Sequence, residues 1–252
     1  MNKYRKVAFD MSTVLFGWSI WYLAIVLIVN IVQIVIHHIH GETAESYMSS
    51  IYFSGNIYMF VIGSIVAKAF LEYFVHNGVT RKDFFKGNAI TGVVLSLLIV
   101  GIGAIVASIQ YFIANVADFS IQFRFDTSAP EAVSDTNVIG EVLKVIVDPR
   151  LYGTENMAVL TLFAILSMIF YFLNGWMIAL GFYKYNSVGS FYILLALFFF
   201  LIKGLIWGGT FSGFSLELIF GNVPIILMLT LLLIGVLLWI IFQMIRRVPI
   251  KI

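Results

Sequence analysis

Charged side chains inside long apolar segments are the residues whose types and spacing suggest chemistry in this sequence. Lys203 lies within one such segment, and Glu217 of the following connection is its natural partner. Lys68 and Glu72 are one helical turn apart near the end of another apolar segment. An ionisable group is costly inside a bilayer, so these residues mark either a transport pathway or ion pairs. The alternative, in which the side chains extend to the membrane surface, stays open.

A group of histidines followed by acidic residues has the composition of a metal site. His37 and His40 would share one face of a helix, whereas the adjacent His38 would point away. Glu42 or Glu45, in the next loop, would have to supply a carboxylate. The simpler interpretation is that the histidines end an apolar segment at the membrane surface. We therefore predict no metal site and keep His37 and His40 as weak candidates.

Motifs of known catalytic sites are missing from the sequence. It has no Walker lysine loop, no Gly-x-Ser-x-Gly and no His-Glu-x-x-His. It also has no cysteine, which excludes disulfides and thiolate chemistry. We expect a protein that is not an enzyme and holds no cofactor of its own.

The amino-acid composition indicates what kind of structural elements hold these residues in place. Of the 252 residues 61% are hydrophobic and 11% are charged, and the mean hydropathy is +1.01, as in an integral membrane protein. We predict an all-α fold in which residues 1–252 form a single transmembrane domain. A helix over residues 1–11 would lie in the membrane interface and lead into the first of six transmembrane helices. The six apolar segments are residues 13–36, 51–74, 89–114, 157–181, 190–208 and 223–245.

The distribution of charge orients these segments. The side that holds both termini collects 11 of the 15 Lys and Arg residues but only 3 of the 13 Asp and Glu residues. The positive-inside rule therefore places both termini in the cytoplasm. Tyrosine and tryptophan fall near the segment ends, as expected at headgroup depth. On the outer side these are Tyr47, Tyr52, Tyr58, Tyr111 and Trp207, and on the inner side Tyr73, Trp176, Tyr183, Tyr185 and Trp239.

Two longer connections lie on the outer side. Residues 115–156 are expected to form a small extracellular subdomain, beginning with the alternating strand pattern of Ile121, Phe123 and Phe125. Residues 208–224 are apolar yet broken by glycines, which indicates a segment that re-enters the membrane or lies in its interface.

The most charged break between apolar segments is the loop over residues 76–88. Asn77-Gly78 is a turn signal, and Thr80 is a candidate N-cap with Asp83 in the first turn of a short helix. The basic residues of the loop would face the cytoplasm, and its two phenylalanines would meet lipid headgroups or a groove on another protein. The alternative, a basic loop that only fixes the topology, stays open. The residues expected to contact a partner are Thr80, Arg81, Lys82, Phe84, Phe85 and Lys86.

In layout and in this loop the chain resembles the membrane subunit of bacterial ABC exporters of the type-2 permease class. Gly78 to Phe85 looks like the family's "Gly-hydrophobic-Ser/Thr-Arg-Lys" loop between the second and third spans. In that family the loop docks on a separate ATPase subunit. The long outer loop departs from better-known members, and the composition resembles permeases of Gram-positive bacteria, some of which export antimicrobial or amphipathic peptides or confer immunity to them.

The resemblance implies an ABC transporter permease of the bacterial cell membrane that exports an amphipathic or hydrophobic substrate, with a peptide favoured. Its partners would be a soluble ATPase that holds ATP and magnesium, a second permease copy in a homodimer or heterodimer, and the lipid bilayer. No nucleic acid is expected. Two alternatives stay open: a membrane sensor or immunity protein that binds a peptide through its outer loop, and an ion-coupled carrier.

Overall fold

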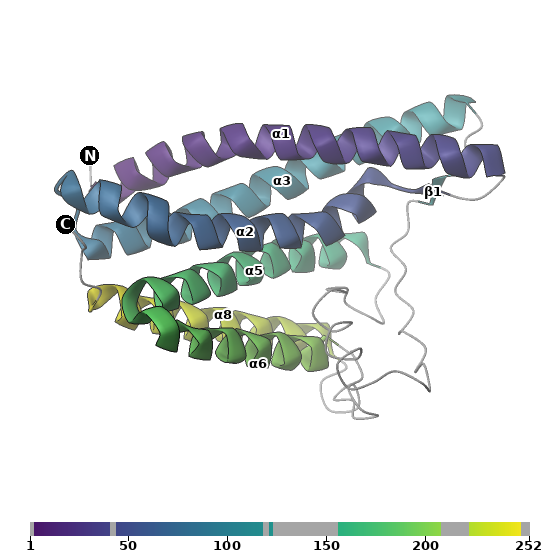
Figure 1. Ribbon diagram of the computed structural model, residues 1–252. Coiled ribbons are helices and arrows are strands. Elements are labelled where there is room, and N and C mark those ends of the chain that lie inside the picture. The colour runs from purple at the N-terminus through teal and green to yellow at the C-terminus, as the bar shows by residue number, and fades with distance from the viewer. Residues whose placement is uncertain (1–2, 41–43, 118–120, 123–155, 208–221, 248–252) are drawn as a thin grey trace.

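The computed structural model describes residues 3–40, 44–117, 121–122, 156–207 and 222–247 as a bundle of helices (Figure 1). The helices are α1 (Lys3–His40), α2 (Tyr47–His76), α3 (Arg81–Ala117), α5 (Met157–Tyr185), α6 (Phe191–Ile206) and α8 (Val223–Arg246), with a short 3-10 helix at Asn186–Ser190. Two strands of two residues each, β1 (Ala44–Glu45) and β2 (Ile121–Gln122), pair in parallel beside the ends of α1 and α3. The all-α prediction is therefore confirmed at the level of fold class.

Within the described ranges, five helices are long and apolar enough to cross a membrane, namely α1, α2, α3, α5 and α8. The segment predicted as the fifth span forms α6, which has 16 residues and a length of about 24 Å. That length is short of a hydrocarbon core of about 30 Å. Residues 3–11, expected as a separate interfacial helix, are instead the first turns of the unbroken α1.

Helix α5 is the centre of the bundle. In its most apolar stretch 67% of the residues are buried, compared with 17% in the corresponding stretch of α1. Helices α1, α2 and α3 pack together on one side of α5, and α6 and α8 pack on the other (Figure 1). Helix α5 therefore lies between the two groups of helices, although α3 also touches α8 directly.

The backbones of α2 and α5 approach closely at two glycines. A Cβ on Gly63 would lie 2.9 Å from the carbonyl carbon of Phe172, and a Cβ on Gly175 would lie 3.0 Å from the carbonyl carbon of Phe60. Small residues permit such packing between membrane helices, where dispersion contacts replace the hydrophobic effect as the attraction. The two glycines therefore fix how α2 crosses α5.

Polar side chains join α1, α2 and α3 along their apolar lengths. The Asn30 amide on α1 donates to Ser50 Oγ on α2 at 3.1 Å and accepts from Gln110 Nε2 on α3 at 2.8 Å. Nearer the middle of α1, the hydroxyls of Ser19 and Tyr58 lie 2.9 Å apart. Each bond satisfies a group that would be costly in hydrocarbon, so the network holds the three helices together.

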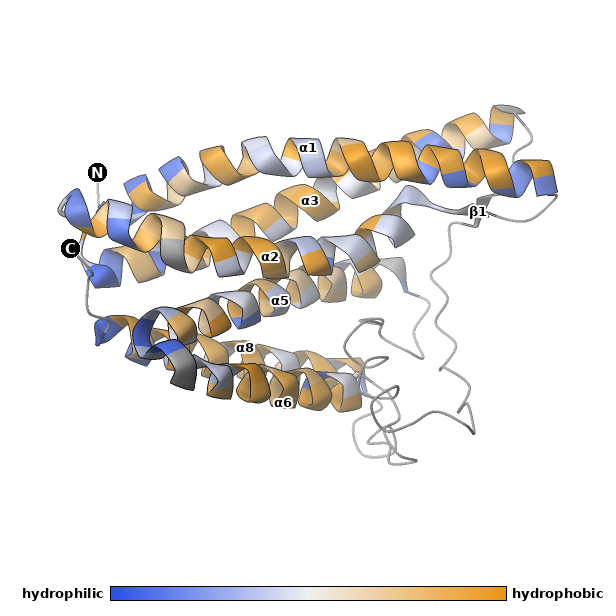
Figure 2. Ribbon diagram, viewed as in Figure 1, coloured by the Kyte–Doolittle hydropathy of each residue, from blue (hydrophilic) through white to orange (hydrophobic). Residues whose placement is uncertain are grey.

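Hydrophilic residues gather where α1 begins and where α8 ends, and Figure 2 shows both at the same end of the bundle. The first described turn of α1 and the last turn of α8 are therefore at one end of the bundle. Not every ring expected at headgroup depth is exposed. Tyr111 and Trp239 are exposed, but Tyr47, Trp176 and Trp207 are buried between helices. Their positions near segment ends did not reveal that they face neighbouring helices.

Two predicted connections lie mostly outside the described residues. Of the outer segment 115–156, the structure describes the last turn of α3, the strand β2 and Asn156, which caps α5. The beginning of the expected strand forms β2 (Ile121–Gln122), and Phe123 and Phe125 lie outside the described residues. Of the connection 208–224, only the beginning of α8 is described.

Candidate functional site

The turn between α2 and α3 has a defined geometry. Gly78 adopts a φ of +75°, a conformation that glycine accepts without strain. The Asp83 N–H donates to Thr80 Oγ1 at 3.1 Å, and the Thr80 hydroxyl donates to Asp83 Oδ2 at 2.7 Å. Thr80 is therefore the N-cap that the sequence predicts. The helix that it caps is not short, however, because α3 continues for 37 residues.

The beginning of α1 and the end of α8 each form a hydrogen bond that holds this turn in place. Lys3 Nζ of α1 donates to the Gly78 carbonyl oxygen at 3.1 Å. Arg81 Nη1 donates to the Arg246 carbonyl oxygen, at the end of α8, at 3.2 Å. Lys82 and Lys86 remain exposed on the same surface. The result is a basic projection that is connected directly to four helices.

The two phenylalanines of the turn face inward, which corrects their expected role. Phe84 is 0% exposed, and its ring lies 6.1 Å from that of Phe74 and 6.4 Å from that of Trp176. Phe85 is half-buried between Trp176 and Phe242, at ring distances of 5.7 and 5.2 Å. Their rings anchor the turn in the protein core, so the surface available to a partner is basic rather than aromatic.

Lys203 lies in an aromatic cage formed by α5 and the end of α6. It is only 3% exposed, so its side chain does not extend to the membrane surface. Its Nζ lies 4.1 Å from the ring centre of Trp207, 4.9 Å from that of Tyr171 and 5.6 Å from that of Phe170. Nζ also donates to Ser167 Oγ at 3.0 Å. Ring faces attract a cation, so the cage stabilises a positive charge in the bundle.

The cage is tied to α8 through Trp207, whose Nε1 donates to Thr230 Oγ1 at 3.0 Å. Glu217, the partner predicted for Lys203, lies outside the described residues. The cage itself escaped the sequence analysis, although Ser167 and Tyr171 are four residues apart on α5 and therefore share a face. That spacing was a usable signal.

The remaining candidates belong to α2 and to the end of α1. Glu72 accepts a hydrogen bond from the Tyr183 hydroxyl at 2.8 Å, whereas the side chain of Lys68 lies outside the described part of the structure. His37 and His40 are at the end of α1, and His40 Nδ1 lies 2.8 Å from the Ile36 carbonyl oxygen. Among the described residues, no three potential metal ligands come together.

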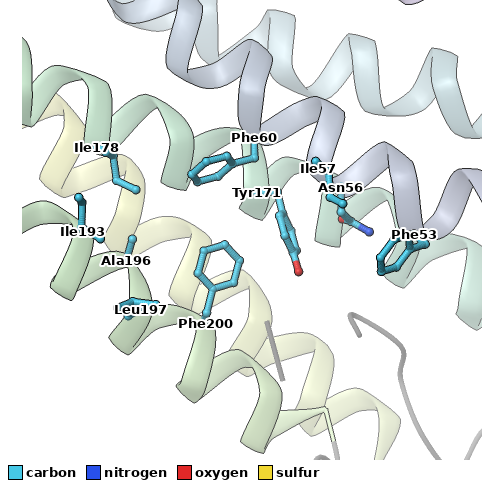
Figure 3. A pocket seen from close by; sticks show the side chains of 10 residues that line it. All are labelled: Phe53, Asn56, Ile57, Phe60, Tyr171, Ile178, Ile193, Ala196, Leu197 and Phe200. Carbon is cyan, nitrogen blue, oxygen red and sulfur yellow. The ribbon is translucent and has the colours of Figure 1, made fainter. Parts of the chain in front are cut away.

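An apolar pocket opens between α2, α5 and α6, next to the Lys203 cage (Figure 3). Its volume is about 260 Å³. Tyr171 projects into it and also forms one wall of the cage, so the two features share a side chain. The lining residues are Phe53, Asn56, Ile57, Phe60, Tyr171, Ile178, Ile193, Ala196, Leu197 and Phe200.

Asn56 is a polar residue in this apolar lining whose side-chain oxygen lacks a hydrogen-bond partner. It is 1% exposed, and its Nδ2 donates to the Tyr52 carbonyl oxygen one turn earlier on α2. Its Oδ1 has no hydrogen-bond partner among the described residues. A buried acceptor without a partner is costly. Because this oxygen has almost no accessible surface, the pocket as it stands favours an apolar occupant. Asn56 was not a sequence-based candidate, although an amide within an apolar helix was a visible signal.

Comparisons with protein-family models, with curated proteins and with solved structures find no match to this chain. Its class therefore rests on its own fold and composition. A helical bundle in which five described helices are long and apolar enough to cross a bilayer is typical of a multi-pass membrane protein.

Proposed function

We propose that this protein is the transmembrane subunit of an ABC exporter of the type-2 permease class, driven by ATP that a separate subunit hydrolyses. In this proposal both termini are cytoplasmic, α6 together with its flanking residues is a sixth span, and a second permease copy completes the path. ATP and magnesium would be held by the ATPase, and the chain would reside in a bacterial cell membrane.

The observation that carries the proposal is the construction of the α2–α3 turn. A capped turn with exposed basic side chains presents a surface that an acidic partner can recognise. Phe84 in the core and the bonds to Gly78 and Arg246 prevent the turn from moving alone. A force applied to the turn would therefore be transmitted along α2 and α3, which have 30 and 37 residues.

The pocket between α2, α5 and α6 supports an apolar or amphipathic cargo. Its walls belong to helices on both sides of α5, so movement of α2 relative to α6 would change its size. A movement that exposed the buried Asn56 Oδ1 would let it accept from an amide N–H, a group that every peptide carries. A peptide-like substrate remains the favoured cargo in the proposal.

Reversal of charge on the turn tests the proposal. We expect Lys82→Glu with Lys86→Glu to weaken association with the ATPase about tenfold or more, because two exposed attractions become repulsions. Both side chains are exposed, so folding should be unaffected. Binding is measured by titrating the purified ATPase against the protein in nanodiscs.

Lys184→Glu is the matched control, because Lys184 is a basic residue at the end of α5, outside the turn. It should weaken binding less than the double reversal. Equal losses for the two variants would contradict a specific docking role for the α2–α3 turn.

The buried Lys203 favours a second candidate function, an ion-coupled carrier. A charged side chain inside a bundle is a feature of such carriers. Transport that continues in proteoliposomes without ATP, and that follows an ion gradient, would support the carrier. Transport that requires ATP and the ATPase would support the exporter.

A further inference from the structure

A groove runs along the outside of α1 and α2, starting at the end of the bundle that carries the basic turn. Three adjoining hollows form it. The first, of about 380 Å³, is bounded by the beginning of α1 and the α2–α3 turn, and it shares Asp10, Tyr73 and Phe74 with the second. The third, whose lining residues all belong to α2, shares Ala69 with the second. We call the three adjoining hollows together the α1–α2 groove.

The mouth of the groove is basic. Lys3 and Lys6 line it and are exposed, together with Asn77 at the end of α2. Lys3 uses one N–H to bind the Gly78 carbonyl oxygen, and an ammonium group has three donors, so others remain for a ligand. Against these two positive charges the mouth has one carboxylate, Asp10. The mouth is therefore suited to an anion that also carries hydrogen-bond donors.

Beyond the mouth the groove is mostly apolar, and its polar lining residues in the third hollow are Ser64 and Glu72. On α2 its lining residues recur every four positions and so form a single ridge; they are Val61, Ile65, Ala69, Tyr73 and Asn77. On α1, Val7 and Val14 lie on either side of Asp10. From Asn77 to Val61 the ridge is about 24 Å long, which exceeds the thickness of about 15 Å of one hydrocarbon leaflet.

We propose that the α1–α2 groove binds an anionic glycerophospholipid of the adjacent leaflet, with its phosphate at Lys3 and Lys6 and an acyl chain along α2. The combination of a charged mouth at the helix ends and an apolar channel below it matches the two parts of a phospholipid. Asp10 accepts hydrogen bonds from headgroup hydroxyls, so the site prefers phosphatidylglycerol, which has such donors, to phosphatidylcholine, which has none. This proposal does not depend on an ATPase partner.

The test measures lipid retention by the full chain, purified in detergent, delipidated and titrated with phosphatidylglycerol or phosphatidylcholine before native mass spectrometry. We expect Lys3→Gln with Lys6→Gln to weaken phosphatidylglycerol binding about 30-fold, as two lysines near a membrane surface each contribute about fivefold. Phosphatidylcholine binding should weaken less, because its choline cation offsets the charge of the phosphate. Lys82→Gln with Lys86→Gln is the matched control, because it removes two charges from the same end without touching the groove.

A second variant tests the apolar channel. Ala69 is exposed and lines two of the hollows, so Ala69→Trp should obstruct the channel without disturbing the core. We expect it to weaken the binding of both lipids while leaving any binding of inorganic phosphate unchanged. Helical circular dichroism and elution volume verify that each variant is folded.

Three results would overturn the proposal. Equal loss of phosphatidylglycerol in the two lysine double variants would show a general effect of charge. Displacement of the lipid by inorganic phosphate, with no effect of Ala69→Trp, would show a site for a small anion only. A change of oligomeric state in the Lys3 and Lys6 variant, without loss of lipid, would assign the groove to contact with a second copy of the chain.

Discussion

Replacing Gly63 by leucine is expected to prevent the chain from accumulating as a folded protein. The new Cβ alone would overlap the backbone of Phe172 on α5, and backbone atoms cannot rotate away as a side chain can. Separating α2 from α5 would disturb the most buried helix of the bundle. We expect the free energy of unfolding to fall by about 3 kcal/mol or more, at the upper end of overpacking effects.

Gly101→Leu provides the matched control, because nothing lies within 4 Å of a Cβ at Gly101 on the exposed side of α3. Fluorescence-detected size-exclusion chromatography of detergent extracts, followed by a thermal melt, measures both variants. The Gly101 variant should resemble the wild-type protein or exceed it in stability, because leucine favours helix more than glycine does. A Gly63 variant that melts with the wild type would contradict the observed crossing of α2 and α5.

Replacing Lys203 by glutamate is expected to destabilise the fold almost as much as the Gly63 substitution does. A carboxylate would be enclosed by the faces of Trp207 and Tyr171, which carry negative partial charge. A buried charge without an opposite partner costs about 3 to 5 kcal/mol. The bond from Ser167 would also change direction, since its hydroxyl would have to donate rather than accept.

The variant Lys203→Met separates the effect of the buried charge on stability from the effect of side-chain packing. Methionine has nearly the shape of the lysine stem, and its thioether is compatible with aromatic neighbours. We expect a change of less than about 1.5 kcal/mol in thermal stability for this variant. If Lys203→Glu melted at the same temperature as Lys203→Met, the cage would not be selecting a cation. Loss of transport in a stable Lys203→Met protein would assign the residue to the pathway.

The helices were largely predictable from the sequence because their cause is local. Apolar segments of membrane length have to satisfy their backbone hydrogen bonds internally, and helices do so. The expected segments 51–74 and 157–181 correspond closely to α2 (Tyr47–His76) and α5 (Met157–Tyr185). The continuity of α1 was missed, because Lys3 and Lys6 resembled the polar face of a separate interfacial helix.

The arrangement of side chains was less predictable because it depends on neighbouring helices. Thr80 could be recognised as an N-cap, since its partner Asp83 is three residues away. Phe84 could not be assigned to the core, because nothing in the turn shows that Trp176 approaches it from α5. In a chain so rich in apolar residues, hydrophobicity does not distinguish a side chain that faces lipid from one that faces another helix.

The same limit applies to Lys203. Its position in the chain indicates a costly charge, but the residues that surround it come from α5 and from the end of α6, and Thr230 of α8 holds Trp207 in place. The pocket at Asn56 and the α1–α2 groove likewise appear only when α2 is placed against α5, α6 and α1.

The central claim is that this protein works with a separate ATPase. The most direct measurement is purification of the tagged wild-type protein from its native membranes in mild detergent, with the co-purifying proteins identified and quantified by mass spectrometry. We predict a soluble ATPase subunit in a ratio of about one to one, as expected for a permease with one docking turn per chain. Absence of any ATPase, under conditions that keep other ABC transporters assembled, would contradict the account.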